Sequence, residues 1–250
     1  MLIIDSHVHY MKVEGFKRSI EEELLAIMDR LKINKAVLMP LEALFPFRGV
    51  QENERIISVS RRFNGRFIPV VTVNPWRDDA VDELRGLLSK GAKALKLHPL
   101  VQGFTPINEI VYPILDLAEK SNIPVIFHTG TPIYSMPLQV LEVALTYPKL
   151  NIVMGHMGLG EYWWDAIRAA KRADNVYLDT AGVRYLPVLE KAVRVIGAER
   201  ILYGSDMPFL SPELELEKIR LLRISEHEKE SILGLNAQKL FNLSVSKDHK

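Results

Sequence analysis

The sequence predicts an α/β protein, a single (β/α)₈ TIM barrel with a short C-terminal helical extension. Eight apolar runs of strand length alternate with eight amphipathic stretches of helix length, as in a parallel sheet covered by helices. The runs are apolar at nearly every position, which is expected when both faces of a strand are buried. The chain has 250 residues, the usual size of such a barrel. An open, doubly wound sheet is disfavoured because no glycine-rich dinucleotide fingerprint follows the first run.

The predicted elements form eight consecutive units, each a strand followed by a helix. The strands are expected at residues 2–9, 35–41, 67–74, 93–98, 124–128, 151–156, 176–180 and 201–206. The helices are expected at residues 18–32, 51–63, 77–89, 107–120, 136–146, 162–173, 187–196 and 213–223. Proline near helix starts and glycine after helix ends agree with these boundaries. The residues concerned are Pro106, Pro137, Pro187, Pro212, Gly91 and Gly197.

Two segments follow the last unit. Residues 226–242 are expected to form a helical extension that packs against the barrel, and the polar residues 244–250 are expected to fray. No linker or shift in composition separates a second domain, so one domain is expected over residues 1–250.

The composition excludes several classes of function. The 32 basic and 31 acidic residues nearly balance at a net charge of +1, and no basic stripe suggests a nucleic-acid partner. The absence of cysteine excludes disulfides and thiolate metal sites. No run is long enough to cross a bilayer, and a cleavable signal peptide would remove the first predicted strand. We therefore expect a cytoplasmic protein with a small-molecule substrate and no membrane partner.

Histidines gather at the ends of the predicted strands. Five of the seven histidines and one aspartate end apolar runs: His7, His9, His98, His128, His156 and Asp206. In a barrel the carboxyl ends of all eight strands meet at one face, where barrel enzymes carry out their chemistry. Neutral imidazoles and a carboxylate are suitable ligands for zinc, and also for manganese or iron. The pattern therefore predicts a divalent metal site at this face.

The phrases around these residues resemble a known family. They are IIDSHVHY, ALKLHP, VIFHTG, IVMGHMG, ILYGSDMP and, near the end, NAQKLF. In this order they resemble the amidohydrolase superfamily, and within it the amidohydrolase-related family that includes aminocarboxymuconate-semialdehyde decarboxylase. The resemblance covers nearly the whole chain and is specific for the superfamily, but not for one reaction.

The resemblance implies a set of site residues. His7, His9, His128 and Asp206 would bind one divalent metal, with zinc as the first choice and manganese or iron as alternatives. His156 would be the acid/base beside the metal, and Asp206 could also accept a proton. We expect a metal-dependent hydrolase, with a non-oxidative decarboxylase as the alternative and an inactive barrel as a minor one. The resemblance also makes a homodimer possible.

Five further residues are candidates for contact with a small anionic or cyclic organic substrate. Lys96 and His98 share a strand face; Lys96 either supports the site or, when carbamylated as in some superfamily members, bridges two metals. Arg48 and Arg184 follow strands 2 and 7 and could bind an anionic group, or serve as a loop connector and a surface residue. Trp163 could form a wall of the site or pack within its helix.

Overall fold

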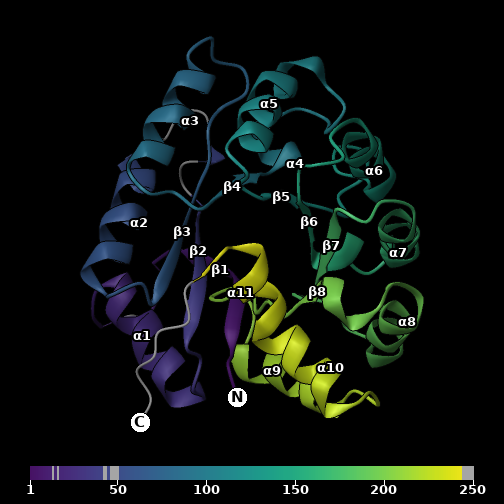
Figure 1. Ribbon diagram of the computed structural model, residues 1–250. Coiled ribbons are helices and arrows are strands. Elements are labelled where there is room, and N and C mark those ends of the chain that lie inside the picture. The colour runs from purple at the N-terminus through teal and green to yellow at the C-terminus, as the bar shows by residue number, and fades with distance from the viewer. Residues whose placement is uncertain (13, 16, 42–43, 46–50, 244–250) are drawn as a thin grey trace.

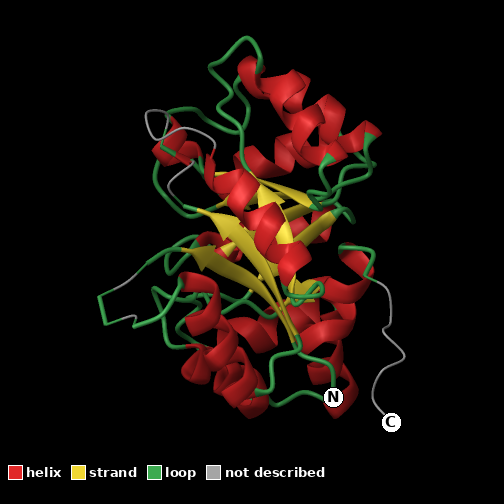
Figure 2. Ribbon diagram, turned by 90° about the vertical axis from the view of Figure 1, so that its left-hand side faces the viewer, coloured by secondary structure: helices red, strands yellow, loops and turns green. Residues whose placement is uncertain are grey.

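In the computed structural model, eight parallel strands stand side by side in chain order and form a nearly closed barrel, with helices outside (Figures 1 and 2). The structure describes residues 1–12, 14–15, 17–41, 44–45 and 51–243. The strands are β1 (Ile4–Tyr10), β2 (Lys35–Pro40), β3 (Phe67–Val71), β4 (Ala94–Leu97), β5 (Val125–His128), β6 (Ile152–Gly155), β7 (Val176–Asp179) and β8 (Ile201–Leu202). The predicted (β/α)₈ barrel is confirmed.

A helix follows each strand on the outside of the barrel. These helices are α1 (Ile20–Leu31), α2 (Gln51–Arg62), α3 (Ala80–Ser89), α5 (Tyr112–Lys120), α6 (Pro137–Thr146), α7 (Trp163–Arg172), α8 (Leu186–Ile196) and α9 (Pro212–Leu221). The sequence did not predict the short helix α4 (Pro99–Gln102), whose backbone turns directly after β4. The first turn of the predicted helix at 107–120 is a separate 3₁₀ turn (Glu109–Val111).

The barrel closes between β1 and the residues that follow β8. Ser6 N donates to Tyr203 O at 2.8 Å, and Asp206 N donates to His7 O at the same distance. A further bond from His9 N to Met207 O continues this seam at 2.8 Å. Strand β8 is therefore shorter than the predicted 201–206, because residues 203–207 bond to β1 in an irregular way. The seam sets the two histidines of β1 beside Asp206.

A register shift in β1 determines which side chains face the interior. The pairing of β1 with β2 shifts between Asp5 and Val8. Ile4 packs inside the barrel, whereas Ile3 and Val8 both pack in the outer layer against the helices. Strict alternation would place Ile4 and Val8 on the same face. The shift reverses the alternation, so that His7 and His9 face the interior above Ile4.

Two apolar layers stabilise the barrel. The inner layer contains one or two side chains from each of seven strands: Ile4, Val37, Met39, Ile68, Val70, Ala94, Ile126, Val153 and Leu202. A larger outer layer lies between strands and helices. The inner layer fills the middle and the amino-terminal end of the barrel, which leaves the carboxyl-terminal end for polar groups.

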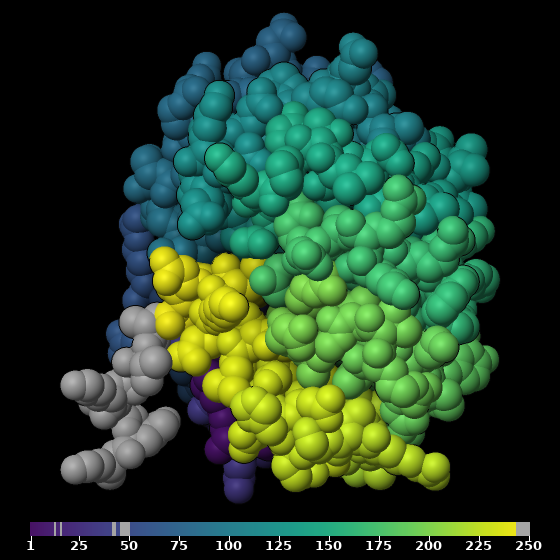
Figure 3. All heavy atoms as spheres, turned by 45° about the vertical axis from the view of Figure 1, so that its right-hand side comes forward, coloured from purple at the N-terminus to yellow at the C-terminus, as the bar shows by residue number. Residues whose placement is uncertain are grey.

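The C-terminal extension closes the amino-terminal end of the barrel. It comprises α10 (Glu226–Glu230), a π-helical turn (Ser231–Leu235) and α11 (Asn236–Leu240). Ala237, Leu240 and Phe241 pack against the inner layer. Figure 3 shows this yellow segment on the surface next to the purple N-terminal residues. The predicted tail 244–250 lies outside the described residues, and no described helix is long and apolar enough to cross a membrane.

Candidate metal and active site

Three side chains at the closing seam form a group that can hold a metal ion. His7 and His9 of β1 and Asp206 after β8 each offer one ligand atom, and the three atoms lie within 4.8 Å of one another. Asp206 Oδ1 lies 3.2 Å from His9 Nε2 and 3.6 Å from His7 Nε2. The group brings two imidazoles and one carboxylate together from opposite ends of the sequence.

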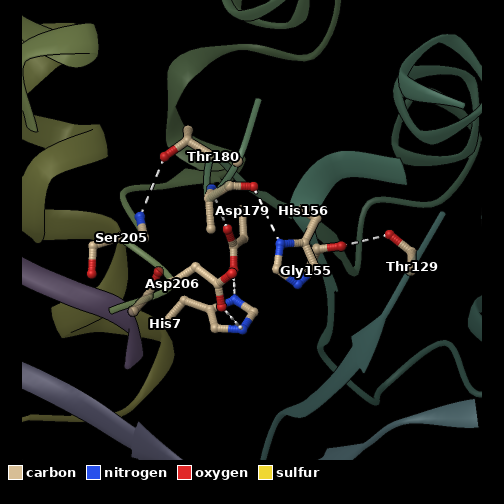
Figure 4. A network of polar contacts seen from close by, with 12 residues as sticks. His7, Thr129, Gly155, His156, Asp179, Thr180, Ser205 and Asp206 are labelled. Carbon is tan, nitrogen blue, oxygen red and sulfur yellow. Dashed lines mark hydrogen bonds and ion pairs between the residues drawn. The ribbon is translucent and has the colours of Figure 1, made fainter. Parts of the chain in front are cut away.

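The buried carboxylate of Asp179, at the end of β7, orients His7 (Figure 4). Its Oδ2 lies 2.5 Å from His7 Nδ1. Although burial opposes ionisation, the electrostatic interaction with His7 and the hydrogen bond to its ring keep the pKa of Asp179 below its ordinary value. An ionised Asp179 accepts the Nδ1 proton, so His7 Nε2 has a free lone pair facing the group. A carboxylate behind a ligating histidine is the usual outer support of a metal site.

The protonation states of the group also suit a metal. Burial lowers the pKa of His9 to about 4, so its ring is neutral near pH 7. Burial alone would raise the pKa of Asp206, but the hydrogen bond from His9 and the electrostatic interaction with His7 hold it below its ordinary value. Neutral imidazole and ionised carboxylate are the forms that bind metal ions. The donors present therefore fit a divalent cation.

His156 lies beside this group with a defined tautomer. Its ring centre is 4.6 Å from that of His7. His156 Nδ1 lies 3.3 Å from the carbonyl oxygen of Ala181. Because a carbonyl only accepts, Nδ1 carries the proton and Nε2 remains a base. Burial lowers the pKa of His156 to about 3.

The backbone is strained where the chemistry is expected. His156 and Asp206 both have left-handed conformations, with φ of 65° and 57°. Each such residue costs on the order of 1–3 kcal/mol and persists only where surrounding contacts enforce it. The contacts around these two residues therefore fix the position of both side chains.

Lys96 and the other two predicted histidines lie next to the group. Lys96 is fully buried, with Nζ 3.4 Å from His7 Nε2, and burial lowers its pKa to about 8. The rings of His98 and His128 stack with centres 3.9 Å apart. His128 Nε2 lies 3.0 Å from the Thr131 hydroxyl, and His128 is not part of the three-donor group found among the described residues. Its role as a fourth ligand stays a prediction.

The group opens into a cavity of about 390 Å³ at the carboxyl end of the barrel. The lining includes Lys96 together with Arg184, Phe209 and Leu210, and four of the predicted histidines: His9, His98, His128 and His156. Trp163 packs against the outer core and Trp164, and is not among the described residues that line the cavity. Arg48 lies outside the described residues. The cavity has the size of a small-molecule site, lined by apolar walls with a few polar groups.

Sequence reasoning missed three residues at or near the cavity. Asp179 ends the apolar run Val176–Asp179, the same signal that identified Asp206, and was overlooked. Glu215 and Lys218 of α9 also line the cavity, but they occur in a helix that is rich in charged residues. No local pattern distinguishes them from their exposed neighbours.

A family model described as Amidohydrolase matches residues 4–243. The chain therefore belongs to the amidohydrolase family, and the resemblance stated above is confirmed. The TIM barrel and the donor group described above agree with what that resemblance implies.

Similar proteins include several decarboxylases. A gamma-resorcylate decarboxylase from Polaromonas sp. is 31% identical over 137 residues, which covers 47% of this chain and 42% of that protein. A 5-carboxyvanillate decarboxylase from Sphingomonas paucimobilis has a TM-score of 0.80 at 16% identity, covering 97% of this chain and 99% of that one. A dihydroxybenzoic acid decarboxylase from Polaromonas sp., solved with manganese and an inhibitor, has a TM-score of 0.78 at 18% identity, covering 98% of each chain.

These comparisons correct the expected reaction. The sequence favoured a hydrolase over a decarboxylase, and this order is wrong, because the curated relatives and these solved structures are named as decarboxylases. The physical reason for the error is that both reactions use the same metal-binding and acid/base residues.

Proposed function

We propose that this protein is a metal-dependent, non-oxidative decarboxylase of small aromatic carboxylic acids. The observation that carries the proposal is the donor group of His7, His9 and Asp206, which opens beside His156 into a cavity of about 390 Å³. The decarboxylases among the similar proteins support the reaction type and the substrate class. The site geometry supports the same chemistry, because it combines a cation site with a neutral base.

His7, His9 and Asp206 would hold the cation, and we propose His128 as a fourth ligand. Manganese in two of the similar structures supports manganese beside zinc as the resident ion. The bound cation would supply positive charge that attracts substrate oxygens and stabilises negative charge as the carboxylate is lost. Lys96 would support this centre, because its Nζ lies 3.4 Å from His7 Nε2.

The protein's own residues would then manage the substrate and the proton. Decarboxylation breaks the bond between the ring and the carboxylate, releases carbon dioxide and leaves an electron pair on the ring carbon. That carbon takes up one proton. His156 Nε2 is the available base that can receive a proton from a substrate hydroxyl and return it to carbon. Arg184, an exposed residue that lines the cavity, would attract the anionic substrate, and His98 would contact its ring.

The first test measures metal content and carbon dioxide release together. We expect one divalent metal per chain, and release of carbon dioxide from 2,6-dihydroxybenzoate or 5-carboxyvanillate that stops on chelation. His156→Gln should lower kcat by about 10²- to 10⁴-fold, the usual contribution of an acid/base group. His227→Gln, at an exposed position on α10, is the matched control and should retain full activity.

Two results would contradict the proposal. One is turnover of these acids to products that still contain the carboxylate carbon. The other is metal-free protein, even after incubation with Zn²⁺ or Mn²⁺. Two metals per chain, reduced to one in Lys96→Ala, would instead show that Lys96 bridges a binuclear centre.

A further inference from the structure

We propose that the largely buried ion pair between Glu215 and Lys218 on α9 positions His156. It holds the loop after β7, residues 180–183, whose Ala181 carbonyl binds the His156 ring. We call this segment the β7 loop. The effect on catalysis rests on the proposed function, whereas the effect on the His156 ring does not.

The ion pair binds the β7 loop through three main-chain groups. Glu215 Oε2 accepts from Gly182 N at 3.1 Å. Lys218 Nζ donates to Val183 O at 2.8 Å and to Thr180 O at 3.3 Å. The two side chains lie 2.5 Å apart, and only 10% of Glu215 and 15% of Lys218 is exposed. Both ends of the loop are thus fixed from the side of α9.

The other side of the same loop supports the reactive groups. Ala181 O accepts the proton of His156 Nδ1 at 3.3 Å, the contact drawn as a dashed line from His156 in Figure 4. Ala181 N donates at 2.6 Å to Asp179 Oδ1, the carboxylate that also orients His7. Among the described contacts, Ala181 O is the acceptor that selects the Nδ1–H tautomer of His156. A shift of the β7 loop would therefore move this acceptor and change the tautomer.

The burial of this pair is the reason to assign it a role beyond stability. A second pair on α9, Glu217 with Arg220, has the same spacing but is about half exposed. Taking an ion pair out of water costs free energy that its attraction often fails to recover, so a buried pair is weak evidence for stabilisation. The pair instead holds three main-chain groups of the β7 loop in place, because hydrogen bonds to charged groups are strong and directional.

The experiment compares Lys218→Met, Glu215→Gln and their double variant with Glu217→Gln/Arg220→Met as the matched surface control. The double variant leaves no unpaired buried charge, so it should fold even where Lys218→Met does not. We measure melting temperature, kcat and KM for carbon dioxide release. We also record the ¹⁵N chemical shifts of the imidazole nitrogens in the zinc-loaded protein, assigning His156 with His156→Gln.

In the wild type we expect the Nδ1–H tautomer at His156. The double variant should show a mixture of tautomers and a kcat lower by about 10- to 100-fold, as for a misplaced catalytic group, with little change in KM. The surface control should match the wild type in both measurements. An unchanged His156 tautomer in the double variant, or an unchanged kcat despite a changed tautomer, would overturn the proposal. If the wild type releases no carbon dioxide, the proposed function fails, and the tautomer alone decides whether the pair positions His156.

Discussion

Replacing Asp179 with asparagine should weaken metal binding without removing any metal ligand. Both oxygens of Asp179 accept hydrogen bonds: Oδ2 from His7 Nδ1 at 2.5 Å and Oδ1 from Ala181 N at 2.6 Å. An amide has only one accepting oxygen, so it cannot satisfy both donors. If its NH₂ group faces His7, the proton moves to Nε2, and that nitrogen can no longer bind a metal. If its NH₂ group faces Ala181, that group and the Ala181 N–H are two donors that face each other in a buried site without an acceptor.

The expected loss follows from these contacts. Asp179→Asn replaces one charge-assisted hydrogen bond, worth about 1.5–3 kcal/mol. This corresponds to a dissociation constant about 10- to 100-fold higher for the metal, the range typical of outer supports of metal sites. The affinity is measured by competition with a chromophoric chelator, titrating Zn²⁺ or Mn²⁺ into the metal-free protein.

The control variant is Asp174→Asn, just before β7, because its side chain is 99% exposed and pairs only loosely with Arg200. It should bind metal like the wild type. If Asp179→Asn also binds with wild-type affinity, then Asp179 does not set the His7 tautomer and the reasoning fails. A lower melting temperature alone would not rescue it, since metal affinity is the measured quantity.

Three further predictions concern stability and substrate binding. Burial raises the pKa of Asp5 from 3.8 to about 7. Between these two pKa values the folded protein binds a proton that the unfolded chain has released, so the free energy of unfolding falls as pH rises. Asp5→Asn should therefore gain up to about 4 kcal/mol relative to the wild type between pH 4 and 8, as measured by urea unfolding. A Cβ on Gly204 would lie 2.9 Å from His7 Cβ, so Gly204→Ala should lower the free energy of unfolding by about 1–3 kcal/mol and weaken metal binding. The control is Gly86→Ala on α3, where a Cβ meets open space; it should raise the free energy of unfolding by about 0.5–1 kcal/mol. Arg184→Ala should raise KM for an aromatic acid about 3- to 10-fold at unchanged kcat; an unchanged KM would show that Arg184 does not attract the substrate.

The fold could be predicted because its signals are local. Each strand is an apolar run and each helix an amphipathic one, and eight repeats of this pattern are compatible with few architectures. The predicted element boundaries are wrong where tertiary contacts override the local sequence pattern. Residues 203–206 look like part of a strand, yet their backbone bonds to β1 instead of extending the ladder with β7.

The site could be predicted only in part, for a related reason. Residues at strand ends converge by geometry, so His7, His9, His156 and Asp206 could be placed together without knowing any contact. The orientation of His7 and His9 depends on the register shift between Asp5 and Val8, which the apolar pattern of β1 does not reveal. The reaction type could not be predicted, because the same cation and base serve attack by water and loss of carbon dioxide.

The end of β7 connects the two halves of the site. Asp179 binds His7 through one oxygen and the β7 loop through the other, and that loop binds His156. The metal-binding group and the acid/base group therefore share one support. A variant there should affect both, so Asp179→Asn should change the His156 tautomer as well as metal affinity. The double variant Glu215→Gln/Lys218→Met acts on the β7 loop from α9. It should change the His156 tautomer with a smaller effect on metal affinity, because the hydrogen bond between Asp179 and His7 does not involve α9.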